Sequence, residues 1–159
     1  MTKEKKQEFT MRMTQANRTE LIVVIYDLFL EYMKDAESAH AAGDKEAFRE
    51  AISHAQPVLS ELISCLDFKY EISYQLQEIY RYCGRCLAAA QAKEDPEELK
   101  GAVISINNLR TGFFEVSKND KSPALMKNSQ KVYAGLTYGR DSLNESLNGN
   151  PSSVTITSC

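Results

Sequence analysis

Residues 21–36, LIVVIYDLFLEYMKDA, carry more apolar side chains than a helix with one water-facing side can hold. Placing each residue about 100° further round a helix axis gathers these side chains into an arc of about 260°, whereas a surface helix needs a stripe little wider than about 100°. The arc contains Leu28, Leu21, Tyr32, Ile25, Ala36, Phe29, Ile22 and Met33, extended on both sides by Val24, Tyr26, Leu30 and Val23. Such a helix is either enclosed by other helices or keeps part of its surface for a partner.

Composition narrows the class of protein. A chain of 159 residues can form one domain that buries roughly 70% of the surface exposed when unfolded. Seven glycines, four prolines and long stretches without helix breakers indicate a soluble, mainly helical protein. The net charge of -3 argues against nucleic acid as the main partner, because phosphate binding requires clustered Lys and Arg.

The first 16 residues hold the one basic cluster, which consists of Lys3, Lys5, Lys6 and Arg12 and is interrupted by Glu4 and Glu8. We expect residues 1–16 to be a flexible segment, with a binding arm as the alternative. The segment lacks the apolar core of a signal peptide, and no run in the chain approaches the roughly 20 apolar residues of a membrane span. We therefore expect a cytoplasmic protein that does not insert into membranes.

Capping residues divide the next 100 residues into four helices. They are expected from Asn17 to Gly43, from Asp44 to about residue 66, from residue 71 to about 93, and from Asp95 and Pro96 to about residue 118. Long helices joined by short turns pack antiparallel, since such turns leave no room for crossovers. The expected fold class is all-α, an antiparallel up-and-down four-helix bundle over residues 17–118.

Apolar stripes define the inward faces of the last two helices. The third has Ile72, Leu76, Ile79, Tyr80, Cys83, Cys86, Leu87 and Ala90, and the fourth has Leu99, Ala102, Val103, Ile106, Leu109, Phe113 and Phe114. We expect residues 119–159 to be a polar, flexible tail, in which a short amphipathic fifth helix can begin after Ser122 and Pro123. Its apolar side would contain Leu125, Met126, Val132, Tyr133 and Leu136, and could occupy the apolar surface that a partner would otherwise bind.

Catalytic and metal sites are discounted. Cys83 and Cys86 form a CxxC, but in mid-helix rather than at the helix start where a redox pair is activated, so a core role is favoured. Asp27, Glu31 and Asp35 are read as a solvated acidic edge. The chain has no glycine-rich phosphate loop and no serine in a nucleophile turn. We expect no enzyme activity, no cofactor and no metal.

Arg110 projects from the inward arc of the fourth helix, and a buried guanidinium requires a partner. Asp67, in the turn after the second helix, is one candidate partner. The alternative is that the Arg110 stem lies along the core and its head reaches water.

Several ordered stretches are similar to one known family. The family typically has an Ala-Ser-Pro-Glu-Glu-Leu start followed by Leu-Tyr-Asp. The matching stretches here are ANRTEL at residues 16–21 and then Ile25, Tyr26 and Asp27. Arg18 stands in place of the proline, and Leu28 stands in place of the glycine that follows Tyr-Asp. Further matches are Ala55, Gln56, Glu61, Leu62, Leu66 and Asp67, then Ile72, Leu76, Ile79, Tyr80, Tyr82, Leu87 and Ala90, and finally Leu109, Arg110 and Phe113 for a Leu-Arg-x-x-Trp ending. From Phe9 to Lys118 the chain resembles the FliS family of flagellar export chaperones.

The resemblance implies a function. Members bind the C-terminal segment of flagellin in the cytoplasm, prevent its premature polymerisation and assist its delivery to the export apparatus, which makes export gate components further candidate partners. Phe9 stands where members tend to have a tyrosine that helps to regulate access to the groove. The client would fold as helices into apolar grooves. The expected partner-binding residues are Phe9, Ile22, Val23, Tyr26, Phe29, Leu30 and Met33, each with the alternative of being core.

Two functions from other classes remain open. A structural helical bundle without a flagellin client could hide the same apolar arc in a homodimer. A thiol redox enzyme would use Cys83 and Cys86 as reactive thiols.

Overall fold

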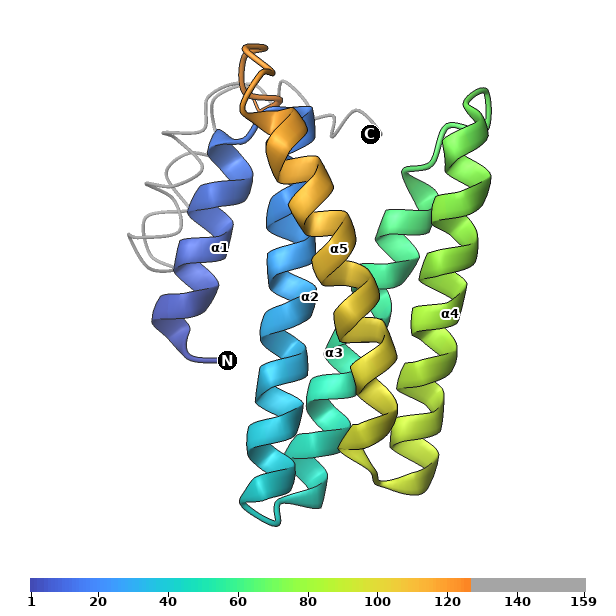
Figure 1. Ribbon diagram of the computed structural model, residues 1–159. Coiled ribbons are helices and arrows are strands. Elements are labelled where there is room, and N and C mark those ends of the chain that lie inside the picture. The colour runs from blue at the N-terminus through green and yellow to red at the C-terminus, as the bar shows by residue number, and fades with distance from the viewer. Residues whose placement is uncertain (127–159) are drawn as a thin grey trace, which may run out of the picture.

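The structure, a computed structural model, describes residues 1–126, and the regular elements in this range are all helices (Figure 1). They are α1 (Lys3–Gln15), α2 (Arg18–Ala41), α3 (Lys45–Ser64), α4 (Glu71–Lys93), the 3-10 helix η1 (Pro96–Leu99) and α5 (Lys100–Ser117). Helices α2 to α5 run alternately up and down, and α1 lies beside α2 at the edge of the bundle. The expected all-α bundle is confirmed. None of these described helices is long and apolar enough to cross a membrane.

Two capping residues expected from the sequence fix the ends of α2 and α3. The Asn17 side chain accepts from the amide of Glu20 at 2.9 Å, and the Glu20 carboxylate accepts from the amide of Asn17 at 2.9 Å. This reciprocal pair is a capping box. The Asp44 carboxylate accepts from the amide of Ala47 at 2.9 Å. Both helices therefore begin within one residue of the predicted positions.

The last helix begins later than expected. The Asp95 carboxylate accepts from the amide of Glu97 at 2.9 Å, as a cap should, but Pro96 opens the 3-10 turn η1 instead of an α-helix. Leu99 ends this turn with its side chain fully buried. The turn thus adds an apolar side chain to the core before α5 starts at Lys100.

A tyrosine pair lies in the centre of the core. The hydroxyls of Tyr26 on α2 and Tyr80 on α4 are hydrogen-bonded at 2.6 Å, and the Tyr26 ring meets the edge of Phe113 with centroids 5.7 Å apart. Burial raises the pKa of both tyrosines, so both hydroxyls stay protonated and available for hydrogen bonding. The largest fully buried side chains are Tyr26, Phe29, Phe48, Met33, Ile52, Leu87, Leu99, Ile106 and Cys83.

Two members of the predicted inward stripes lie outside the core. Ile72, in the first turn of α4, is 57% exposed, and Phe114, in the last turn of α5, is 40% exposed. Figure 1 shows the reason, since α4 and α5 lie close at one end of the bundle and separate toward the end that carries these residues. The helical periodicity predicted the inward stripes of α4 and α5 correctly over most of their length. At this end of the bundle, however, the two helices are too far apart to cover the last residues of each stripe.

The expectation of a flexible N-terminal segment is wrong. Residues 3–15 form α1, whose start is capped by Thr2, with the Thr2 hydroxyl accepting from the amide of Lys5 at 3.3 Å. Glu4 in the first turn and Arg12 in the last have the charges that suit the helix dipole. Apolar periodicity could not predict this helix, because within it only Phe9 and two methionines are apolar.

The chain that leaves α5 returns to the start of α2. The Asn17 side-chain amide donates to the carbonyl of Asp120 at 3.2 Å, and the Thr19 hydroxyl donates to the Asp120 carboxylate at 2.6 Å. The amide of Leu125 donates to the carbonyl of Ala16 at 3.0 Å. Hydrogen bonds from Ser122 and Thr19 lower the pKa of Asp120 to about 2. Residues 118–126 are thereby fastened to the junction between α1 and α2.

Most of the predicted tail lies outside the described residues. Residues 119–126 contain no helix, so a helix does not begin directly after Ser122 and Pro123. The remaining residues of the predicted apolar side, Val132, Tyr133 and Leu136, fall outside residues 1–126.

Candidate partner-binding site

Helix α1 runs antiparallel to α2 and packs along its outer side (Figure 1). Phe9 is the one apolar side chain of α1 that is buried, and it is not part of the main core cluster of α2 to α5. The guanidinium of Arg12 lies 5.5 Å from the centre of the Phe9 ring, within the range of a cation–π contact. Helix α1 is therefore anchored by one aromatic side chain.

The remaining attachment of α1 is electrostatic. The N-terminal amino group pairs with Asp35 at 2.9 Å, the Lys5 ammonium lies 3.7 Å from the Glu31 carboxylate, and the Arg12 guanidinium donates to Asp27 at 2.5 Å. The expectation that Asp27, Glu31 and Asp35 form a solvated edge is therefore wrong. Their spacing of four residues places them on one face of α2, where they receive the positive charges of α1.

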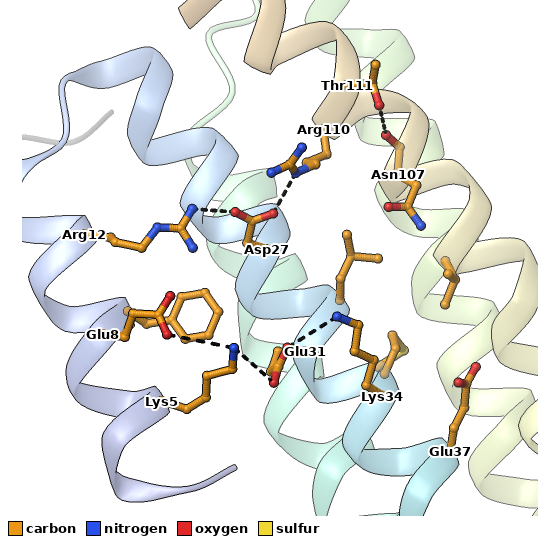
Figure 2. Close-up of a pocket in the computed structure, with 14 residues that line it drawn as sticks. Lys5, Glu8, Arg12, Asp27, Glu31, Lys34, Glu37, Asn107, Arg110 and Thr111 are labelled. Atoms are coloured by element: carbon orange, nitrogen blue, oxygen red, sulfur yellow. Dashed lines mark hydrogen bonds and ion pairs between the residues drawn. The ribbon is translucent and has the colours of Figure 1, made fainter.

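Asp27, on α2, pairs with one arginine from α1 and one from α5 (Figure 2). One carboxylate oxygen accepts from Arg12 and the other accepts from Nε of Arg110 at 2.7 Å. Burial alone would raise the pKa of Asp27, but the hydrogen bonds from Arg110 and Arg12 outweigh it and lower the pKa. The carboxylate is thus ionised and fixed between two guanidinium groups.

Arg110 consequently has a different partner from the one considered from the sequence. Asp67 is exposed and accepts instead from the amide of Lys69 at 3.0 Å, in its own turn. Asp27 and Arg110 are 83 residues apart in the chain, and no periodic pattern connects them. Their pairing follows from the packing of α5 against α2.

This pairing predicts the order of two stability losses. Asp27→Ala is expected to lower the free energy of unfolding by about 1–3 kcal/mol, because it leaves the half-buried Arg110 without its carboxylate. Asp67→Ala removes one exposed turn contact and should cost less than about 1 kcal/mol. Urea unfolding followed by circular dichroism measures both, and a larger loss for Asp67→Ala would contradict the assignment.

A cavity of about 430 Å³ opens between α1, α2 and α5. Figure 2 shows the polar residues around it, with Asp27 and Arg110 at one end and Lys5, Glu31 and Lys34 further along. Apolar side chains from all three helices also contribute to the wall, namely Phe9, Leu30, Met33 and Val103. The wall of the cavity is thus mostly charged and polar, with these four apolar side chains among the polar ones.

The predicted partner-binding residues fall into two groups. Tyr26, Phe29 and Met33 are at most 1% exposed, and Val23 and Phe9 are also buried. Ile22 and Leu30 are half-buried and pack against the edge of the core. The apolar arc of α2 is therefore largely covered within the chain, by α3 and α5 on the inner side and by α1 on the outer side.

The sequence analysis did not single out a cluster of exposed aromatic residues around the turn between α3 and α4. Phe68, Tyr70 and Tyr74 are exposed there, and the rings of Phe68 and Tyr74 lie 5.0 Å apart. Three aromatic residues within seven positions at a turn were the available signal.

The CxxC lies in the middle of α4, as expected. Cys83 is fully buried and Cys86 is half-buried, and both are free thiols. Burial raises the pKa of Cys83 to about 12, whereas a reactive thiol requires a lowered pKa. The core position of Cys83 is confirmed. No cluster of metal-ligating side chains occurs in the part of the chain that the structure describes.

Comparison with known families gives one match. The model of the family described as flagellar protein FliS matches residues 1–120, which include α1, the whole bundle and the start of the segment that returns to α2. No curated protein matches the chain significantly. Family membership implies a role as a flagellar export chaperone and a flagellin client. The family model covers about three quarters of the chain, and the chain therefore belongs to the FliS family of flagellar proteins.

Proposed function

We propose that this chain is a cytoplasmic chaperone that binds the C-terminal segment of flagellin, prevents its premature polymerisation and assists its delivery to the export apparatus. The family supports the chaperone role. The placement of α1 supports the mechanism, because this helix packs beside a cavity that Leu30, Met33 and Val103 help to line, while the main core cluster contains no residue of α1.

Displacement of α1 provides the route for the client. The main core cluster contains residues of α2 to α5 and η1 only, so α1 can leave without opening it. Its departure vacates the site of the Phe9 ring beside Leu30 and Met33, which line the same cavity. The junction at Ala16 and Asn17 stays attached to Asp120 and Leu125 by hydrogen bonds, so α1 would move relative to this fixed point.

A disordered client segment can then fold in place of α1. Its apolar side chains would occupy the vacated groove at helical spacing, and their burial offsets the loss of chain entropy. The same groove therefore binds either α1 or the client. This competition accounts for the family trait of an N-terminal residue, here Phe9, that regulates access.

Leu30 provides the test of the client site. Leu30→Asp is expected to weaken binding of the flagellin C-terminal segment at least about tenfold, because it places a charge among the few apolar side chains that line the groove. Isothermal titration calorimetry measures the affinity and a thermal melt measures folding.

Ile104→Asp is the matched control, since Ile104 is 62% exposed on α5 and does not line the cavity. Equal affinity of both variants, with both folded, would contradict the site. Failure of the unchanged protein to bind the segment would contradict the proposed function and favour the self-associating bundle, which light scattering would detect.

A further inference from the structure

We propose that the groove selects its partner helix by charge, and that Asp27 accepts a hydrogen bond from a cation that follows the partner's apolar anchor by three residues. This inference rests on the proposed function, because the partner is the client helix that takes the place of α1. The inference identifies Asp27 as a residue that determines specificity, and it specifies a cationic side chain on the client helix.

The charges of α1 and of its docking surface are complementary. The first 16 residues hold four cationic side chains and two carboxylates, which are Lys3, Lys5, Lys6 and Arg12 against Glu4 and Glu8. On the side of the bundle, the two cavities beside α1 are lined by four carboxylates and two cations, which are Asp27, Glu31, Asp35 and Glu37 against Lys34 and Arg110. After α1 leaves, the groove is net negative, so it favours a positively charged helix.

Asp27 has one permanent and one exchangeable partner. Arg110 belongs to the bundle and keeps its bond to one carboxylate oxygen, whereas Arg12 leaves with α1 and frees the other oxygen. The Asp27 side chain is 17% exposed with α1 in place, and Arg12 is the donor that this carboxylate loses when α1 leaves. A guanidinium or ammonium on the incoming helix would restore this bond.

The spacing on α1 defines the pattern of the partner. Phe9 and Arg12 are three residues apart, and Lys5 precedes Phe9 by four, so all three side chains lie on one face of the helix. The Lys5 ammonium meets Glu31 and the Arg12 guanidinium meets Asp27, on either side of the apolar anchor. The groove thus fits an amphipathic helix with cations four residues before and three residues after an apolar side chain.

Peptides of residues 1–17 test this pattern in the full chain. Phe9→Asp in the protein releases its own α1, and peptides labelled at the C-terminus report binding by fluorescence anisotropy. The Arg12→Gln peptide is expected to bind about five- to tenfold more weakly than the unchanged peptide. In a protein that also carries Asp27→Asn, the two peptides should bind equally.

A Lys3→Gln peptide is the control, since it loses the same charge at an exposed position outside the three ion pairs. Equal losses for the Lys3→Gln and Arg12→Gln peptides would overturn the proposal, as would discrimination that persists with Asp27→Asn. If Asp27→Asn prevents folding, Glu31→Gln with a Lys5→Gln peptide provides the same comparison on the neighbouring ion pair.

The flagellin segment is then measured against the same two proteins. Weaker binding to the protein with Asp27→Asn supports the proposal, and unchanged or tighter binding overturns it while the proposed function stands. If the segment binds neither the unchanged protein nor the Phe9→Asp protein, but the peptides show the Asp27 dependence, the proposed function fails and the charge selection stands.

Discussion

Phe9→Asp is expected to tighten binding of the flagellin C-terminal segment about tenfold. The substitution places a charge where the anchor of α1 is buried, so the helix undocks and no longer competes with the client. An apparent affinity falls in proportion to the fraction of protein with an open groove, and docking worth about 1.4 kcal/mol lowers it tenfold. Calorimetry measures the gain.

Limited proteolysis provides an independent readout of the same variant. Trypsin should cut after Arg12 faster once α1 is undocked. The bundle should remain resistant to cleavage, because Phe9 is not part of its main core cluster. Gln7→Asp is the matched control, since it adds the same charge at an exposed position of α1. Unchanged affinity and unchanged cleavage in Phe9→Asp would show that α1 does not cover the client site.

Phe29→Ala is expected to lower the free energy of unfolding by about 3–5 kcal/mol, the range for deletion of a large aromatic side chain from a packed core. Phe29 is fully buried in the main cluster, although its position on the apolar arc of α2 also suited a client surface. Chemical unfolding by urea measures the loss.

Ile104→Ala, at an exposed apolar position, should change stability by less than about 0.5 kcal/mol. A folded Phe29→Ala protein with near-normal stability and lost flagellin binding would instead place Phe29 in the client site. The comparison thus separates the two interpretations of the α2 arc that the sequence left open.

Local signals predicted the bundle well. Asn17 and Asp44 cap their helices through hydrogen bonds made within four residues, so the sequence around each contains the whole interaction. The inward stripes were correct where a neighbouring helix lies alongside, as at Leu87 and Ile106. They were wrong at Ile72 and Phe114, because the separation of two helices is a property of the assembled bundle.

The candidate site was harder to predict, since it depends on contacts between distant segments. Helix α1 has little apolar periodicity, and its docking depends on ion pairs with Asp27, Glu31 and Asp35. These acidic residues have the same spacing whether they face water or another helix. The excess of apolar surface on α2 was a correct observation, but much of it is covered by the chain itself.

The contact between Asp120 and Asn17 has a consequence for the order of folding. It closes a loop of 103 residues, so it cannot form until nearly the whole described chain has been synthesised. During translation α2 leaves the ribosome well before α5. The apolar side of α2 that packs against α5 therefore stays exposed until α5 has been synthesised. During that interval the exposed apolar side of α2 can associate with other chains, which is the kind of premature association that the proposed function would prevent in the client.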